Sequence, residues 1–165
     1  MRKNPRKAAT LKNKISALNR APTFVIRRAN QIANAAFVDA CFELELTPAQ
    51  YAILFALRHA GSISQNEAGR LVMLDRCTTS MVVKLLLHRD LVNRAPDPGD
   101  RRRILLSLSN AGRLLLARAE NMSQRASRAL LSVFDDDQAT TFLQLLERFT
   151  LSHGERLGAA AQQEF

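Results

Sequence analysis

The sequence contains few of the signals that mark a secreted, membrane-spanning or disulfide-stabilised protein. Its two cysteines, Cys41 and Cys77, lie far apart and indicate neither a disulfide framework nor a closely spaced pair of metal ligands. No apolar run approaches the roughly 18 residues of a membrane span. No hydrophobic segment near the N-terminus resembles a secretory signal. These absences predict a cytoplasmic protein in a reducing compartment.

Signals of catalysis are also scarce. The three histidines, His59, His88 and His153, are scattered, and there is neither a glycine-rich phosphate-binding loop nor a recognisable nucleophile motif. A zinc-responsive protein would need clustered His, Cys or carboxylate ligands, and the spacings give that little support. An enzyme is a rival interpretation, because residues distant in sequence can meet in space. The expectation is a non-enzyme with no catalytic residue, cofactor or metal.

Charge is distributed unevenly along a chain of ordinary composition. Its 165 residues, 47% apolar and 24% charged, suit one soluble domain or one subunit of an oligomer. Residues 1–38 hold nine Lys or Arg and no acid, and residues 70–113 hold nine basic and four acidic residues, within a formal net charge of +9. We expect the first zone to be a mobile arm that touches phosphate; a solvated tail is the alternative.

Four regions are expected along the chain. Residues 1–15 are basic, lack apolar periodicity and predict a flexible arm. From Pro22, which suits a first helical turn, apolar residues recur at steps of three and four and predict a long helix ending near Glu45. We therefore assign residues 16–46 to an N-terminal helix, 47–112 to a central lobe and 113–165 to C-terminal helices.

The central lobe begins with two helices, each opened by a capping sequence. Thr47-Pro48-Ala49-Gln50 starts the first helix, Gly61 stops it, and Ser62-Ile63 predicts a short strand. Ser64-Gln65-Asn66-Glu67 starts the second, whose inner side should include Ala68, Leu71 and Val72. Only about Met73–Asp75 separates it from the next helix, which is the spacing of a helix-turn-helix.

The next segment, Asp75–Asp90, predicts a helix with one apolar and one small, polar, basic side. Thr79, Val82, Val83 and Leu86 should pack inward, and Arg76, Cys77, Ser80, Lys84 and His88 should point outward. Short side chains early in the helix can approach base edges, and longer cations later suit phosphates. An ordinary amphipathic surface helix is the alternative. The candidate DNA contacts are Arg76, Cys77, Thr78, Ser80 and Lys84.

A basic hairpin follows. Residues 91–95 and 103–108 predict paired strands, with Ile104, Leu106 and Leu108 facing inward, and Pro96, Pro98 and Gly99 force the turn between them. Arg101, Arg102 and Arg103 are adjacent at the hairpin tip, and a narrow, electronegative minor groove would be a suitable partner for them. A solvated charge run is the alternative. Helix and hairpin together outline a winged helix-turn-helix that docks on duplex DNA.

The C-terminal region predicts two further helices. Ser109 can cap a helix whose apolar side runs from Leu115 to Val133, about seven turns or roughly 38 Å. Asp135–Asp137 favour the start of another helix, with an apolar face of Phe142, Leu143, Leu146 and Phe149, and little pattern follows Gly154. Two copies of the chain could cover these helices as a two-fold dimer. A pseudo-palindromic operator with half-sites about 10 bp apart would then match it.

The order of these parts resembles the MarR family, the multiple-antibiotic-resistance-type transcriptional regulators. The resemblance spans about Phe24–Ala117 and is carried by LTPAQYAILFAL, LDRCTTSMVVKLL and LVNRAPDPGDRRRILLSLSNAGRLLL. The last segment is the most specific, because the family's wing carries Asp-x-Arg before a strand ending in Leu-Ser or Leu-Thr. The resemblance implies that Asp100 braces the wing and that Arg102 enters the minor groove.

A second segment, FVIRRANQIANAAF, resembles a subgroup of the family associated with aromatic-acid catabolism. The resemblance implies a small phenolic or carboxylate ligand bound between the dimer helices and the DNA-binding lobe. A small aromatic acid needs an apolar cleft with one or two cations. From the sequence we expect Arg27 or Arg28 to bind the carboxylate and Phe24, Tyr51 and Phe55 to contact the ring. The alternative places the arginines on the surface or at a dimer interface and the aromatics in the core.

The sequence also departs from the family pattern. Leu85 and Leu87 stand where charges are common, and Asp90 replaces the usual glycine before the first wing strand. These differences suggest local repacking. Asn30 stands where the subgroup often has His, which leaves the identity of the ligand open.

We therefore expect a mainly α fold with a small β-hairpin wing, in which long N- and C-terminal helices form a homodimer. The expected function is a ligand-responsive repressor, released from its DNA operator by a small aromatic acid or its CoA thioester. Two alternatives stay open: a redox-responsive regulator acting through Cys77, and an architectural DNA-binding protein without an effector.

Overall fold

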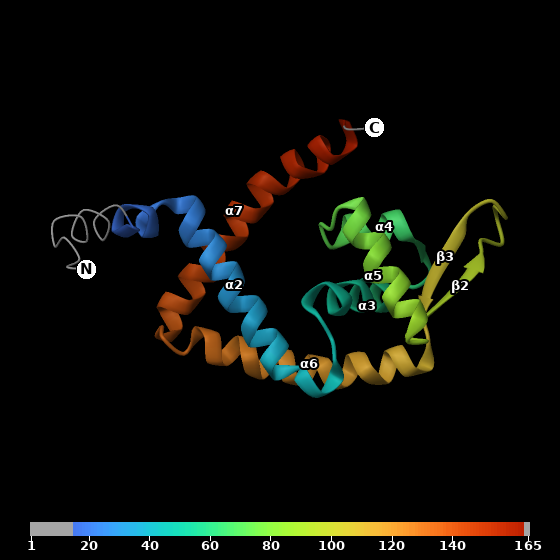
Figure 1. Cartoon of the computed structure of the whole chain (residues 1–165), viewed down its shortest axis with the longest axis horizontal. Helices are drawn as coiled ribbons and strands as arrows, with labels where there is room; N and C mark the ends of the chain where they lie inside the picture. Colours follow the sequence, from blue (N-terminus) through green and yellow to red (C-terminus); the bar gives the residue numbers. More distant parts are fainter. Residues whose placement is uncertain (1–14, 164–165) are drawn as a thin grey trace, which may run out of the picture. The chain divides into compact units, whose positions relative to one another are not determined.

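The structure, a computed structural model, describes residues 15–163, with side chains as far as Gly154. The chain forms two compact units, residues 1–36 and 37–165. The first unit contains most of α2 (Pro22–Ala40), and residues 15–20 are also helical (Figure 1). The expected basic arm, residues 1–15, lies outside the described residues except for Ile15.

The second unit contains the remaining elements. In chain order they are η1 (Phe42–Leu44), α3 (Pro48–Ala60), β1 (Ile63–Ser64), α4 (Gln65–Leu71), α5 (Arg76–His88), β2 (Val92–Pro96), β3 (Ile104–Leu108), α6 (Asn110–Leu131) and α7 (Asp136–Gln163). This order confirms the mainly α fold with a hairpin wing. The elements from α3 to β3 lie within residues 47–112, the expected central lobe.

The helix starts follow from local capping. Thr47 Oγ1 accepts from the Gln50 amide at 3.3 Å, and the Gln50 side chain accepts from the Thr47 amide at 3.0 Å, with Pro48 at the first helical position. Ser109 Oγ accepts from the Gly112 amide at 2.9 Å to start α6. Each cap satisfies an amide that has no partner inside its helix. The predicted starts of α3 and α6 are confirmed.

The sheet has three antiparallel strands in the order β1-β3-β2. Ile63 of β1 lies opposite Leu106, and Val92 of β2 lies opposite Leu108. Leu106 and Leu108 are buried as predicted. Ile104 was expected to face inward but is 38% exposed, because it pairs with Pro96 towards the hairpin tip, beyond the core.

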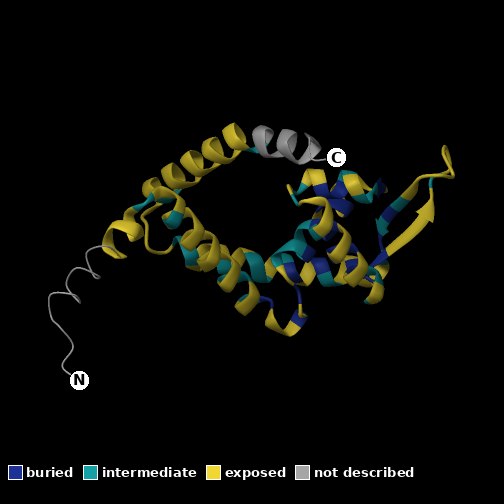
Figure 2. Cartoon of the chain, turned by 45° about the horizontal axis from the view of Figure 1, so that its top comes forward, coloured by how far each residue is buried: buried dark blue, intermediate teal, exposed yellow. Residues whose placement is uncertain are grey.

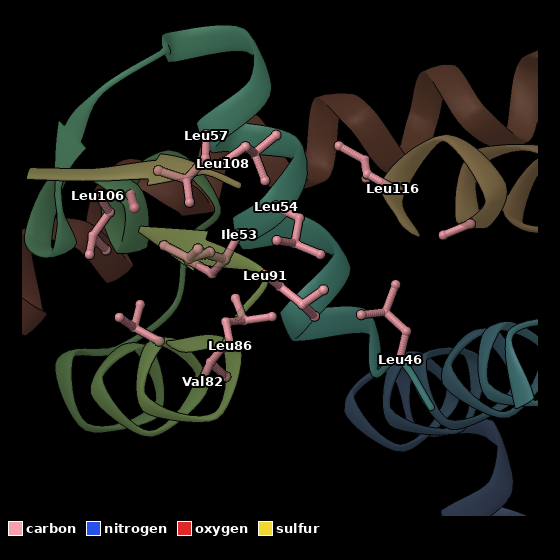
Figure 3. Close-up of a cluster of buried hydrophobic side chains, with 14 of the residues drawn as sticks. Leu46, Ile53, Leu54, Leu57, Val82, Leu86, Leu91, Leu106, Leu108 and Leu116 are labelled. Atoms are coloured by element: carbon pink, nitrogen blue, oxygen red, sulfur yellow. The ribbon is translucent and has the colours of Figure 1, made fainter. Parts of the chain in front are cut away.

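The core lies among residues 41–108 and extends to the first half of α6. Leu54 of α3, Leu86 of α5 and Leu116 of α6 are fully buried and belong to one apolar cluster (Figure 3). Each such side chain contributes about 1.5–3 kcal/mol of burial free energy. Figure 2 shows buried residues gathered in this region, whereas the hairpin tip and the described side chains of α7 are mostly exposed.

The ends of two helices differ from the prediction, and a third helix extends beyond its apolar pattern. α2 ends at Ala40 rather than near Glu45, because the chain tightens into η1 and Glu45 adopts a left-handed φ of 48°, which cannot continue a helix. α6 ends at Leu131, so Val133 lies beyond it and is 78% exposed rather than packed. α7 continues to Gln163, although little apolar pattern follows Gly154.

Two shorter elements also differ. The short strand is Ile63–Ser64, one residue later than Ser62–Ile63. Leu71 is 58% exposed rather than buried, because the tight approach of α4 to α5 is made one turn earlier, at Ala68 and Gly69. A Cβ at Gly69 would collide with the side chain of Thr79 on α5, so the absence of a side chain permits this crossing.

Candidate nucleic-acid interface

The start of α5 is held by Asp75. Its carboxylate accepts from the Thr78 hydroxyl at 2.6 Å and from the Thr78 amide at 2.8 Å. These two bonds, the hydroxyl bond first, lower the pKa of Asp75 from its ordinary value of 3.8. The Thr79 hydroxyl donates to the Asp75 carbonyl at 2.7 Å on the buried side. The first turn of α5 is therefore fixed in place before any partner binds.

The inner and outer sides of α5 lie as predicted. Its buried residues are Thr79, Val82, Val83 and Leu86. Exposed residues include Arg76, Cys77, Ser80, Lys84 and His88. Thr78 is half-buried, and its hydroxyl is already bonded to Asp75. Four of the five candidate contacts on α5 thus face solvent on one side of the helix, and the fifth supports its cap.

Sequence reasoning missed one feature of this exposed side. Met81 is 59% exposed and Leu85 is 46% exposed, and with Cys77 they form a stripe at steps of four residues. The missed signal was that spacing, because residues four apart lie on the same side of a helix. Apolar side chains beside Ser80 and Lys84 can contact the methyl groups of thymine in a major groove.

The wing is the β2–β3 hairpin, whose tip is braced by backbone and carboxylate bonds. The Arg103 amide donates to the Asp100 carbonyl at 2.8 Å, and the Asp97 amide donates to the Arg103 carbonyl at 2.9 Å. The Asp100 carboxylate accepts from the Arg102 amide at 3.0 Å, and that of Asp97 accepts from the Gly99 amide at 2.8 Å. Both carboxylates are therefore used to shape the loop.

The side chains of the three wing arginines are exposed to solvent. Arg101, Arg102 and Arg103 are exposed, and among the described residues none of them lies within salt-bridge distance of a carboxylate. Three like charges held close together repel one another, and this repulsion is relieved when a polyanion binds. The braced loop thus presents a concentrated positive charge.

The candidate ligand residues fall into two groups, one in each unit. In the first unit Arg27 lies with its guanidinium carbon 5.8 Å from the centre of the Phe24 ring and donates to Gln31 at 3.4 Å. Arg28 is exposed. In the second unit Tyr51 lies 6.0 Å from Phe55, centre to centre. Each group is a local cluster of its own.

The aromatic cluster of the second unit is longer than predicted and includes a cation. Phe37 lies 5.2 Å from Tyr51 on one side, and His59 lies 4.4 Å from Phe55 on the other. The Arg58 guanidinium carbon is 5.4 Å from the centre of the Phe55 ring. The sequence hypothesis omitted Arg58, because no motif singles it out among the residues of α3.

Arg58 joins α3 to α6 through an ion pair with Glu120. Arg58 Nη1 donates to Glu120 Oε2 at 2.6 Å, and Nη2 donates to the second carboxylate oxygen. Burial, and after it the negative charge of Glu120, raise the pKa of the Tyr51 phenol, so Tyr51 is neutral and available as a hydrogen-bond donor at neutral pH. This arrangement offers ring faces, a hydroxyl and a guanidinium within one small region.

Among the described residues, no group of three His, Cys, Asp or Glu side chains could hold a metal ion. None of the described helices is long and apolar enough to cross a membrane. Both cysteines are free; Cys41 is fully buried and Cys77 is exposed.

Comparison with known proteins agrees with this geometry. A sequence profile described as MarR family matches residues 44–103. The transcriptional repressor NicR of Pseudomonas putida is 31% identical over 124 residues, which cover 75% of this chain and 78% of NicR.

Solved structures match similar shares of this chain. The crystal structure of a probable transcriptional regulator from Pseudomonas aeruginosa is 36% identical, covers 80% of this chain and 98% of its own, and superposes with a TM-score of 0.77. BpsR of Bordetella bronchiseptica, whose DNA binding is regulated by 6-hydroxynicotinic acid, is 26% identical with a TM-score of 0.75, over 80% of this chain and 94% of BpsR. The fold, the exposed side of α5 and these likenesses lead to one assignment: the chain belongs to the MarR family of transcriptional regulators.

Proposed function

We propose that the chain is a ligand-responsive, DNA-binding transcriptional repressor rather than an enzyme, and that it acts in the cytoplasm. The single observation that carries this proposal is the pairing of an exposed polar helix side on α5 with three unpaired arginines on a braced wing. α5 would lie in a major groove, where Arg76, Cys77, Ser80 and Lys84 meet bases and phosphates. The wing arginines would lie in the adjacent minor groove, with Asp100 bracing the loop.

The active species would be a homodimer built by residues 16–46 and 113–165, with residues 47–112 forming the DNA-binding lobe. The exposed apolar face of α7 supports this, because Phe142, Leu143, Leu146 and Phe149 are each 39–49% exposed. Phe142 also stacks on Phe134 at 5.2 Å, which extends the face. A second copy of the chain is the expected cover, and two-fold symmetry then predicts a pseudo-palindromic operator.

The effector would be a small aromatic acid or its CoA thioester. The regulation of DNA binding by 6-hydroxynicotinic acid in the similar protein BpsR supports an aromatic or heteroaromatic acid. Arg27 or Arg28 stays the prediction for the carboxylate, with Phe24 beside Arg27. Tyr51 and Phe55 offer ring faces, and Arg58 adds a guanidinium next to them.

The proposal is tested with an operator selected from a randomised duplex pool. Fluorescence anisotropy should show one dimer per operator, with affinity that falls on addition of 6-hydroxynicotinic acid, 4-hydroxybenzoic acid or benzoyl-CoA. Equal affinity for selected and random duplexes at fixed salt would favour an architectural protein instead.

A redox-responsive regulator is the second candidate, because Cys77 is exposed in the first turn of α5. Peroxide treatment distinguishes a redox-responsive regulator from a ligand-responsive one. Release of DNA by peroxide in wild type but not in Cys77→Ser would favour the redox function, and an unchanged affinity would exclude it.

A further inference from the structure

The end of α5 is bonded to segments on both sides of it in the sequence. α5 finishes with the Asp90 amide donating to the Leu87 carbonyl at 3.1 Å and the Leu91 amide donating to the Leu86 carbonyl at 3.0 Å. Asp90 has a left-handed φ of 55°, the geometry that closes a helix in this way. We call residues 89–91 the junction.

The first connection runs from the junction to η1. Arg89 Nη2 donates to the Leu44 carbonyl at 2.9 Å, and Nη1 donates to the Glu45 carbonyl at 2.6 Å. Carbonyls at the end of a helical turn have no partner within it, and a charged donor makes the stronger kind of hydrogen bond. One planar guanidinium can hold both carbonyls at once, which a lysine ammonium cannot do with the same geometry.

The second connection runs from the junction to α6. Ser109, the cap of α6, donates its hydroxyl to the Asp90 carbonyl at 2.7 Å and its amide to the Leu91 carbonyl at 3.2 Å. Gly112 in the first turn of α6 lies against the Leu91 carbonyl so closely that a Cβ there would collide with it. The junction therefore cannot shift without α6 or the Arg89 bonds adjusting.

These contacts join α5 to η1, which lies within the proposed dimer segment 16–46, and to the first turn of α6, which continues into the proposed dimer segment 113–165. η1 follows α2 after one residue, Cys41, which is fully buried, and Leu44 and Leu46 anchor the following turn in the core. We infer that Arg89 is a positioning residue that transmits displacement of the dimer helices to the recognition helix α5. The inference rests on the proposed function, since it describes how effector binding would reach the DNA-facing helix.

Arg113 provides a matched control. It too is an arginine that donates to a carbonyl, that of Leu108 at 3.0 Å, and it also donates to the Asn110 side chain; Arg113 is exposed, whereas Arg89 is half-buried. Its bonds stay within five residues of its own position, whereas those of Arg89 span 44 and 45 residues. Arg113→Gln therefore removes the same charge and a similar bond without cutting a long-range connection.

The first experiment compares wild type, Arg89→Gln, Arg89→Lys and Arg113→Gln. Operator Kd is measured with and without a saturating probe (6-hydroxynicotinic acid, 4-hydroxybenzoic acid or benzoyl-CoA), and probe binding to DNA-free protein is measured by calorimetry. The coupling is the operator Kd measured with probe divided by the operator Kd measured without it. We expect Arg89→Gln to lower this ratio at least about fivefold, the low end of ordinary coupling, while the affinity for the probe stays unchanged. Arg89→Lys should fall between Arg89→Gln and wild type, and Arg113→Gln should match wild type.

Two results would overturn the inference. One is an unchanged ratio in Arg89→Gln. The other is a parallel loss of probe and operator affinity in that variant, which would show that Arg89 only supports the fold.

A second experiment needs neither probe nor DNA. A nitroxide on the exposed Cys77 reports the distance between the two α5 helices of a dimer by pulsed electron paramagnetic resonance, and Cys41 is too buried to react. Arg89→Gln should broaden this distance distribution and Arg113→Gln should not; equal widths would contradict the inference. If no probe released wild-type protein from its operator, the effector response of the proposed function would fail, and the widths would still decide the role of Arg89.

Discussion

The salt dependence of DNA binding offers the sharpest test of the wing. Arg101, Arg102 and Arg103 are exposed, and the hydrogen bonds that shape their loop come from backbone groups and from Asp97 and Asp100. Replacing all three arginines by alanine therefore removes positive charge without removing the bonds that hold the hairpin tip. The variant should fold and dimerise like wild type, and its operator affinity should fall.

The magnitude follows from counterion release. Each phosphate neutralised contributes about 0.9 to the slope of log affinity against log salt, so loss of three contacts flattens the slope by up to about 2.7. Between about 50 and 200 mM salt, a slope change of that size corresponds to roughly a 40-fold smaller loss of affinity. Arg102→Ala alone should change the slope by about 0.9 if only that guanidinium reaches the DNA.

The assay is fluorescence anisotropy with the selected operator at several salt concentrations. A triple variant at Arg118, Arg125 and Arg128 of α6, all of them exposed, alters the net charge by the same amount away from the wing and should keep the wild-type slope. A wild-type slope in the wing variant, or an equal change in the α6 variant, would refute the placement of the wing against DNA.

The remaining predictions concern packing, base recognition and pH. Gly112→Ala should destabilise the protein by about 1–3 kcal/mol in urea unfolding, because the new Cβ meets the Leu91 carbonyl, whereas Gly99→Ala should stay within about 0.5 kcal/mol. Replacing operator thymines by deoxyuridine should weaken wild-type binding about fourfold for each methyl group that Met81 covers and should not affect Met81→Ala; equal effects on both proteins would exclude that contact. The pKa of Asp75 is lowered in the folded state, so the stability difference between wild type and Asp75→Asn should be present above its ordinary value of 3.8 and disappear as pH falls through the lowered folded value; a difference that persists in acid would contradict this.

Local features of the chain were predictable because their causes lie within a few residues. The caps at Thr47, Asp75 and Ser109 depend on a side chain and an amide three residues later. The inward side of α5 follows from apolar spacing, and the position of the wing turn follows from Pro96, Pro98 and Gly99. These signals were sufficient for the fold class and the family.

Asp90 shows where the sequence needed the structure. Its place in the family pattern suggested local repacking, but its φ of 55° shows that this position requires a left-handed conformation, which glycine adopts freely and Asp tolerates. The predicted ends of helices were wrong for a similar reason, because they depend on contacts outside the helix. Whether Leu71 was buried depended on how α4 meets α5 at Gly69, which no pattern within α4 could report.

By itself, the sequence determined which segments are helices or strands, where most helices begin, that Ser80 and Lys84 face outward on α5, and that the wing tip is basic. Only the tertiary structure decided that Arg58 meets Glu120 across α3 and α6 and that Arg89 reaches the carbonyls of Leu44 and Glu45. The physical reason is distance along the chain. Caps and periodicity act within one or two turns, whereas bonds between residues 44 to 62 positions apart exist only after the core has packed the helices that carry them.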